Sequence, residues 1–546
     1  MKMKNTKWKK NIIWIVVDAV RNYKANDKYG KLDIMQEFAK ESVEFTNAVS
    51  SAPSTLMSVG AMIASKPAYH LSRDFEIFEY DQRMFPPLTA VLKSNSYNNY
   101  TIHHYPQSRE KMNHILSPVS PKYWPQQINK HKLWNEDEIN SIFKNLIKKG
   151  IKEPFFLYVH YDVPTNNKFA SNKVKSVLRK LKEKNIYDDS IIILCSDHGY
   201  PDPRRKKLSL KQKVLEGHDL FVTDDNIMMP LLIKYPNCPK GLKVTEMVSS
   251  LDIAPTILEI LEIPYVKCGF EGLNLLKIID GEKTPKRKIR TDTRYCFQPK
   301  KVTSLRSNKY KYVRYLDEQL GKKEKFFNLE QDRWEQRNLI HSNNKEIINK
   351  INEFRKEFLY SEERSIKIQK KYLQKKFETL LYKRDYRKIK KILIFGSADT
   401  LFVDILLANI LQSLGNVSID VIIKRNSAQK LEINSKKINF IFSNLTYNDF
   451  KKRLKKLKNA RYDLIIIPFA NRLGIGYNQI FKIAKQFKKD KIITVDYNMD
   501  LIIESNMWVA ILKHLSKDLM VNLLDWKNFS GRLVLLAKRI IFDKYY

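Results

Sequence analysis

The sequence predicts an α/β protein with two domains, each built around a mostly parallel sheet. Short apolar runs, which are typical of buried parallel strands, alternate with amphipathic stretches along the first part of the chain. Three of these runs end in Asp or His. After a basic stretch without Gly or Pro, the same alternation begins again. These observations predict a larger domain over residues 1–345, a basic helical linker over 346–387 and a smaller Rossmann-like domain over 388–546.

The larger domain is expected to hold a mostly parallel sheet sandwiched by helices. Its expected strands cover residues 11–18, 43–48, 100–105, 153–160, 191–195 and 226–236. Helices are expected over residues 32–41, 56–65, 86–94, 174–184 and 251–264. Two later stretches, 304–316 and 325–339, predict the strands of a small antiparallel region.

The composition indicates a folded, strongly basic protein. Of the 546 residues, 43% are apolar, which is enough for a large core, and the formal net charge is +40. Such a charge attracts polyanions. The alternative is a general composition bias without any such partner, because lysine is abundant along the whole chain. The sequence has no zinc-finger spacing, arginine-rich arm or RNA-binding aromatic motif. We therefore expect no nucleic-acid partner.

The cysteines and the N-terminal segment bear on location. The four cysteines are widely spaced and form no CxxC pair, which argues against a disulfide framework and fits a reducing compartment. The apolar run 12–17 follows several lysines, but it is too short for a signal peptide and ends in Asp18. No apolar run approaches the 18 or more residues of a membrane span. We expect a cytoplasmic protein with peripheral contact at the inner face of the membrane.

Acidic and histidine residues follow three of the expected strands. Asp18 ends the first, His160 the fourth and Asp197-His198 the fifth. In open α/β sheets, ligands bind outside the carboxyl ends of the strands. Two carboxylates and one imidazole suit Mn²⁺ or Zn²⁺, with Mg²⁺ or Ca²⁺ as alternatives. For Asp197-His198-Gly199 alone a surface turn is the alternative, but three such strand ends favour an active-site rim.

The order of the motifs resembles the sulfatase branch of the alkaline-phosphatase superfamily over residues 11–345. NIIWIVVDAVRN resembles the first metal-ligand strand, FTNAVSSAPSTLMSVGAMIAS the nucleophile segment and SDHG the second metal-ligand pair. EGHDLFVTDDNIMMPLLIKYP resembles the later histidine segment. LDIAPTILEILEIP, SNKYKYVRY and FFNLEQDRWEQRNL are similar to the C-terminal signatures of the family. The resemblance implies the corresponding fold and an ester-processing enzyme with one divalent metal ion.

The resemblance also implies roles for individual residues. Thr55 corresponds to the nucleophile and a metal ligand, and Asp18, Asp197 and His198 to the other ligands. A helix N-cap is the alternative for Thr55.

The family's later histidine corresponds to His218, which implies contact with the substrate's anionic oxygens or protonation of the leaving group. A structural role is the alternative. His160 and His104 are further candidates for substrate contact. Of His103 and His104, we expect one at the rim and the other in the packing. Arg21 is expected to anchor the loop that follows Asp18 rather than to touch substrate.

Two departures from sulfatases shift the expected substrate. Sulfatases proper carry a C/S-x-P-x-R signature whose Cys or Ser becomes formylglycine, whereas residues 55–59 here are TLMSV. Threonine cannot form that aldehyde, and Ala19 stands where many sulfatases have a second acid. Both changes favour phosphomonoesters or phosphodiesters over sulfate esters, as in threonine-dependent phosphatases, phosphodiesterases and bacterial envelope transferases. The alternatives are an envelope-glycan or lipid phospho-group transferase at the membrane surface, and a non-catalytic anion-binding member.

The last third of the chain predicts a second, smaller α/β unit. Its pattern loosely resembles half of a GT-B glycosyltransferase or a receiver-like accessory domain. Gly396-Ser397-Ala398 is not a G-x-G-x-x-G motif, so dinucleotide binding has no support. The segment 506–546 carries basic amphipathic stretches that predict either peripheral contact with anionic membrane or docking onto this domain.

Overall fold

The computed structural model divides the chain into two compact units, residues 1–365 and 366–546. They meet within one long helix, α11 (Lys345–Tyr382). The residues that the structure describes are 10–68, 86–103, 136–162, 166–202, 204, 221–282, 286–293, 301–317, 321–382, 389–398, 400–414, 416–431, 433, 435–443, 460–468, 478–495 and 501–503.

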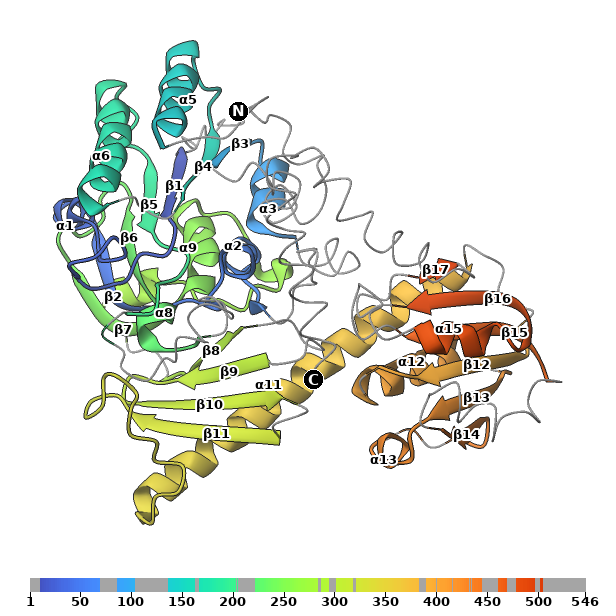
Figure 1. Cartoon of the computed structure of the whole chain (residues 1–546). Coiled ribbons are helices and arrows are strands. Elements are labelled where there is room, and N and C mark those ends of the chain that lie inside the picture. Colours follow the sequence, from blue (N-terminus) through green and yellow to red (C-terminus); the bar gives the residue numbers. More distant parts are fainter. Residues whose placement is uncertain are drawn as a thin grey trace, which may run out of the picture. The chain divides into compact units, whose positions relative to one another are not determined.

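The first unit contains a seven-stranded sheet in the order β3-β4-β1-β5-β6-β2-β7 (Figure 1). Only β6 runs against its neighbours within this sheet. The strands are β1 (Ile12–Val17), β2 (Val43–Val49), β3 (Asn98–His103), β4 (Phe155–Tyr161), β5 (Ile191–Cys195), β6 (Met228–Lys234) and β7 (Lys243–Ser249). The expected mostly parallel sheet is confirmed.

Strand β1 is central because it is apolar on both faces. Ile12, Trp14 and Val16 point into one hydrophobic cluster, and the alternating residues Ile13 and Ile15 point into the other. Each side chain is fully buried. Burial of such a side chain contributes about 1.5–3 kcal/mol. Because both of its faces are apolar and buried, β1 lies in the middle of the sheet rather than at an edge.

Helices cover both faces of this sheet, as the sequence predicted. Residues of α2, α3 and α9 join the cluster around Trp14, whereas residues of α1, α5 and α6 join the cluster around Ile13. The helices of the unit before α11 are α1 (Asp33–Ala39), α2 (Thr55–Ala64), α3 (Leu88–Ser94), α5 (Glu136–Lys149), α6 (Asn167–Glu183), α8 (Asp224–Ile227), α9 (Ile253–Ile260) and α10 (Leu276–Ile279). Two 3₁₀ turns, Ser250–Asp252 and Val266–Cys268, flank α9.

A four-stranded antiparallel sheet follows, in the order β11-β10-β9-β8. Its strands are β8 (Ile289–Asp292), β9 (Lys301–Arg306), β10 (Tyr310–Asp317) and β11 (Gly321–Asn328). Buried Tyr312 and Phe326 pack edge-on against Phe358 and Phe354 of α11, with ring centroids 5.8 and 5.4 Å apart. The first turns of α11 therefore belong to the first unit.

The second unit has a six-stranded sheet in the order β14-β13-β12-β15-β16-β17. The strands are β12 (Lys391–Gly396), β13 (Ser418–Ile423), β14 (Ile438–Phe442), β15 (Arg461–Pro468), β16 (Lys488–Val495) and β17 (Leu501–Ile503). The first five are parallel and β17 is antiparallel. This is the 3-2-1-4-5-6 order of a Rossmann-type sheet. The described helices are α12 (Thr400–Leu414), α13 (Arg425–Ala428) and α15 (Asn478–Ala484).

The basic helix predicted over residues 346–387 overlaps α11, and the boundary between the two units falls inside this helix. The predicted amphipathic segment 506–546 lies outside the described residues. Within the described parts of the chain, no helix has both the length and the apolar character needed to cross a bilayer.

Replacement of the central Trp14 by Ala should destabilise the first unit by about 3–5 kcal/mol, because it empties a large, fully buried site. Urea unfolding followed by circular dichroism measures this loss. Val266→Ala is the control, since Val266 is 91% exposed and its truncation should change stability by no more than about 0.5 kcal/mol. Equal midpoints for the two variants would contradict the central position of β1.

Candidate active site

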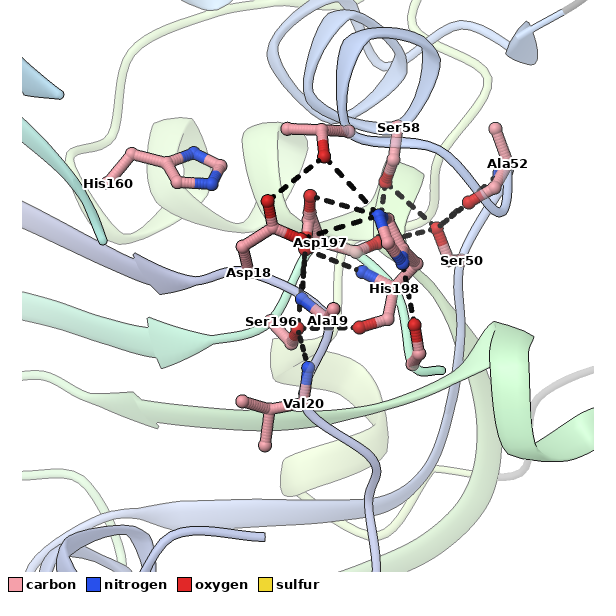
Figure 2. A network of polar contacts seen from close by, with 12 residues as sticks. Asp18, Ala19, Val20, Ser50, Ala52, Ser58, His160, Ser196, Asp197 and His198 are labelled. Carbon is pink, nitrogen blue, oxygen red and sulfur yellow. Dashed lines mark hydrogen bonds and ion pairs between the residues drawn. The ribbon is translucent and has the colours of Figure 1, made fainter. Parts of the chain in front are cut away.

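Three candidate metal ligands meet at the carboxyl ends of β1 and β5. The strands pair in parallel with Val16 opposite Cys195, so Asp18 and Asp197 each follow two residues later. One ligand atom from each of Asp18, Asp197 and His198 lies within 4.8 Å of the others, and all three residues are buried. Figure 2 shows their side chains converging at this edge. The sheet thus brings together the ligands predicted from sequence.

Thr55 faces the same cluster from α2. Its Oγ1 lies 3.3 Å from Asp18 Oδ2 and 3.3 Å from His198 Nε2. The N-cap of α2 is Ser54, whose side chain makes no capping hydrogen bond. Thr55 is the first helical residue, so the N-cap alternative does not apply to it.

The orientation of His198 makes its imidazole suitable as a metal ligand. Nδ1 lies 2.7 Å from the carbonyl oxygen of Gly199, a contact that requires the proton on Nδ1. In the neutral imidazole Nε2 is then the unprotonated nitrogen, and it lies 3.4 Å from Asp197 Oδ2 and 3.6 Å from Asp18 Oδ1. A carbonyl acceptor on the far nitrogen is the usual partner of a metal-bound histidine.

The two oxygens of Asp197 have different surroundings. Oδ1 accepts hydrogen bonds from the main-chain N–H groups of Ala19 and His198, at 3.1 and 2.9 Å. Oδ2 is buried and accepts no hydrogen bond. Burial alone would raise the pKa of Asp197, but the two N–H donors, together with His198 and His160 in their protonated forms, outweigh it and lower that pKa. An ionised, buried oxygen of this kind fits a divalent cation.

Two serines that sequence reasoning missed fix the main chain of Asp197. Ser50 Oγ and Ser58 Oγ each donate to the carbonyl oxygen of Asp197, at 2.7 and 2.6 Å, and lie 2.8 Å from each other. Ser50 follows β2 and Ser58 lies one turn into α2. The segment that carries Thr55 is thereby tied directly to a candidate metal ligand.

Gly199 is required by close packing. A Cβ at this position would lie 2.2 Å from the carbonyl oxygen of Asp225, well inside van der Waals contact. The Gly199 N–H donates to Asn226 O, and the Tyr200 N–H donates to Asp225 O. The turn after His198 is therefore held against α8.

Arg21 joins the two loops that carry the ligands. It is fully buried, and its Nε and Nη2 donate to the carbonyl oxygens of Tyr200 and Pro201, at 2.7 and 3.2 Å. Its Nη1 pairs with Asp27 at 2.8 Å. Arg21 thus links the segment after Asp18 to the segment after His198. These contacts agree with the anchoring role predicted from sequence.

The other predicted histidines fall in different places. His160 is fully buried in β4, and its Nδ1 lies 2.8 Å from the hydroxyl oxygen of Tyr158. In its protonated form it would lower the pKa of Asp197, so it belongs to the surroundings of the cluster. His104 and His218 lie outside the described residues, as does the side chain of His103.

Two family models match the first unit. The sulfatase model matches residues 10–164 and 165–263, and the model for the C-terminal region of N-sulphoglucosamine sulphohydrolase matches residues 218–363. These residues belong to the sulfatase branch of the alkaline-phosphatase superfamily, a family of ester hydrolases. The resemblance inferred from the sequence motifs is confirmed.

Individual relatives share parts of the chain. Choline-sulfatase from Rhizobium meliloti is 28% identical over 181 residues, which cover 32% of each chain. Lipoteichoic acid synthase 2 from Bacillus subtilis is 25% identical over 256 residues, which cover 44% of this chain and 37% of that one. The chain therefore spans about a third of the length of these relatives.

A solved structure supports the fold. A candidate sulfatase from Bacteroides thetaiotaomicron aligns with a TM-score of 0.50 at 15% identity, over 65% of this chain and 93% of that one. At this identity the likeness establishes the shared fold alone.

Asp197→Asn should abolish most of the stabilisation by divalent metal, because it removes the charge of a buried ligand. The thermal midpoint of the wild type should rise with added Mn²⁺, whereas that of the variant should move little. Asp162→Asn, a change at the same sheet edge outside the cluster, should respond as the wild type does. A full Mn²⁺ response from Asp197→Asn would contradict the ligand assignment.

Arg21→Lys should weaken Mn²⁺ binding by about tenfold, because a lysine keeps the charge but lacks the planar fork that links the two loops. Titration calorimetry measures the affinity. The exposed Arg179→Lys is the matched control and should bind as the wild type does. Unchanged affinity in Arg21→Lys would show that the loops hold their spacing without this link.

Proposed function

We propose that this chain is a divalent-metal-dependent hydrolase or transferase that acts on phosphate-type esters with Thr55 as its nucleophile. The observation that carries the proposal is the position of Thr55 Oγ1, 3.3 Å from both Asp18 Oδ2 and His198 Nε2. A hydroxyl is a weak nucleophile at its ordinary pKa and needs such neighbours. Asp18, Asp197 and His198 would hold the cation, which would polarise the ester and favour the ionised hydroxyl.

The reaction that these residues support has two displacements. Thr55 Oγ1 forms a bond to phosphorus while the bond from phosphorus to the leaving oxygen breaks; the hydroxyl proton passes to solvent and the leaving oxygen takes up a proton. Water, or an acceptor hydroxyl in a transferase, then bonds to phosphorus and gives up its proton, while the bond from phosphorus to Thr55 Oγ1 breaks and Oγ1 is protonated again. The N–H groups in the first turn of α2 favour the anionic group beside Thr55.

The residue at position 55 favours phosphate over sulfate. A threonine cannot become the formylglycine of sulfatases, whereas its hydroxyl can attack phosphorus directly. The names of the relatives do not decide the matter, since both a sulfatase and a lipoteichoic acid synthase are among them. Sulfate-ester hydrolysis is the alternative that the substrate panel below tests.

A transferase is the second candidate function. The match to lipoteichoic acid synthase 2 extends over 256 residues and favours it. A transferase would pass the group to an acceptor hydroxyl of a glycan or lipid instead of water. We therefore propose an anionic small-molecule, glycan or lipid-linked ester as the substrate class.

The histidines complete the proposed site. His160 is buried near Asp197 and is proposed to act on the substrate or on the charge balance of the cluster. His218 is proposed to protonate the leaving oxygen, as its place in the family motif implies. His104 stays a predicted substrate contact.

Thr55→Ala should lower kcat/KM by roughly 10³-fold or more, because it removes the attacking oxygen. Assays with an aryl phosphate, a bis-aryl phosphodiester and an aryl sulfate, each with added Mn²⁺, measure the change. Ser54→Ala is the matched control, since the Ser54 side chain makes no capping hydrogen bond, and should keep activity within about twofold.

Two results would overturn parts of this proposal. Full activity of Thr55→Ala would exclude the nucleophile assignment. A wild-type preference for the aryl sulfate would exclude the phosphate assignment and leave the metal site intact.

A further inference from the structure

A cavity on the first unit is separate from the metal cluster. Its volume is about 290 Å³, close to the lower end of the roughly 300–1,000 Å³ typical of small-molecule pockets. Its walls come from the loop after β1, the end of β2, the α8–β6 junction and the antiparallel sheet with the segment after β11. None of the four residues Asp18, Thr55, Asp197 and His198 lines it.

The floor of this cavity is fixed and its charge is balanced. Asp224 pairs with Arg306 and with Lys311, each at 2.9 Å, and Lys311 also pairs with Glu335 at 3.3 Å, so two carboxylates face two cations. Arg306 also donates to Met247 Sδ and to the carbonyl oxygen of Ser307. Because buried charges are costly unless they are paired, these contacts hold the floor in one arrangement. They leave no excess positive charge there to select an anion.

The rim, in contrast, carries a cation that aromatic rings position. The guanidinium of Arg333 lies 4.9 Å from the ring centroid of Tyr23 and 5.7 Å from that of Trp334. Arg333 is exposed, and the two rings are partly buried. Glu330 also lines the cavity but pairs with Lys309 at 3.2 Å, and among the described residues no carboxylate lies within ion-pair distance of the Arg333 guanidinium. The two rings therefore position the Arg333 guanidinium, and its N–H groups can donate to an anionic group.

Three amide side chains add neutral hydrogen-bonding groups to the lining. Asn22 Nδ2 donates to Thr46 O at 3.3 Å, and Asn47 Nδ2 donates to Thr245 O at 2.7 Å. Each of these amides is thereby oriented and keeps an oxygen that can accept. Asn308 lies in the exposed turn between β9 and β10 and offers a further amide. Neutral amides of this kind are better hydrogen-bond partners for the hydroxyls of a ligand than for a second charged group.

We propose that this cavity binds a sugar residue that carries one anionic group. The fork of Arg333 would take the carboxylate, sulfate or phosphate group in a bidentate contact. The amides would pair with ring hydroxyls, and the apolar face of the sugar ring would pack against Met228 and Leu329 of the lining. A neutral sugar would leave Arg333 without a partner, and a free inorganic anion would leave the amides and the apolar lining without one.

The cavity adjoins the loops of the catalytic cluster. Tyr23 belongs to the segment that begins at Asp18, and the carbonyl oxygen of Asp225 accepts from the N–H of Tyr200, two residues after His198. A glycan with its ester at Thr55 could therefore place another anionic sugar here. This part of the inference rests on the proposed function and makes an anionic glycan the substrate class.

Titration calorimetry of the full chain with methyl β-D-glucuronide tests the site without any turnover. The glucuronide should bind with 1:1 stoichiometry. Methyl β-D-glucoside and inorganic phosphate should each bind at least about tenfold more weakly, since each loses part of the contacts. Arg333→Gln should weaken glucuronide binding by about tenfold or more.

Two further variants locate the binding. Arg337→Gln, an exposed arginine of the same segment outside the cavity, should bind as the wild type does. Thr55→Ala should also bind the glucuronide normally, which separates this site from the catalytic one. No saturable binding of the glucuronide, equal affinity for the glucoside, or an Arg333→Gln variant that binds normally would each overturn the proposal. Activity on aryl esters bears on the proposed function alone.

Discussion

The parallel pairing of β1 with β5 is the constraint on which the candidate site depends. It places Asp18 and Asp197 at the same level, so two carboxylates meet in a buried environment. Carboxylates there are costly unless hydrogen bonds and opposite charge compensate them. The N–H groups of Ala19 and His198 supply part of this compensation. A divalent cation at the same point would supply the rest, and the hydroxyl of Thr55, the proposed nucleophile, lies beside the carboxylates.

Other parts of the first unit hold that pairing in a usable geometry. Arg21 links the loops after the two strands through main-chain carbonyl oxygens. Ser50 and Ser58 attach the Thr55 segment to the main chain of Asp197. The same segment is also fixed from the antiparallel sheet, because Thr291 Oγ1 donates to Ser50 O and the Asp292 N–H donates to Ser51 O. Three separate regions of the chain therefore set the position of one hydroxyl.

The sequence predicted those features that depend on local pattern. A buried strand needs an apolar run, and alternating strands and helices produce a parallel sheet, so the sheet was predictable. Asp or His at the ends of parallel strands meet at one edge of that sheet, so the candidate ligand cluster was predictable too. Ser50 and Ser58 were not, because a serine hydroxyl finds its acceptor only through the tertiary fold. The cavity at Arg333 could not be predicted from the sequence either, since its lining comes from segments that are more than 250 residues apart in sequence. The roles of His104 and His218 stay predictions.

The central claim is that Thr55 carries the transferred group during the reaction. Rapid acid quench of the wild type with an aryl phosphate and Mn²⁺, followed by peptide mass spectrometry, tests it most directly. A phosphoryl group on Thr55 is expected in the quenched enzyme. The same enzyme quenched without substrate should carry none. A phosphoryl group on another residue, or turnover of the aryl phosphate without any covalent phosphoryl-enzyme, would contradict it.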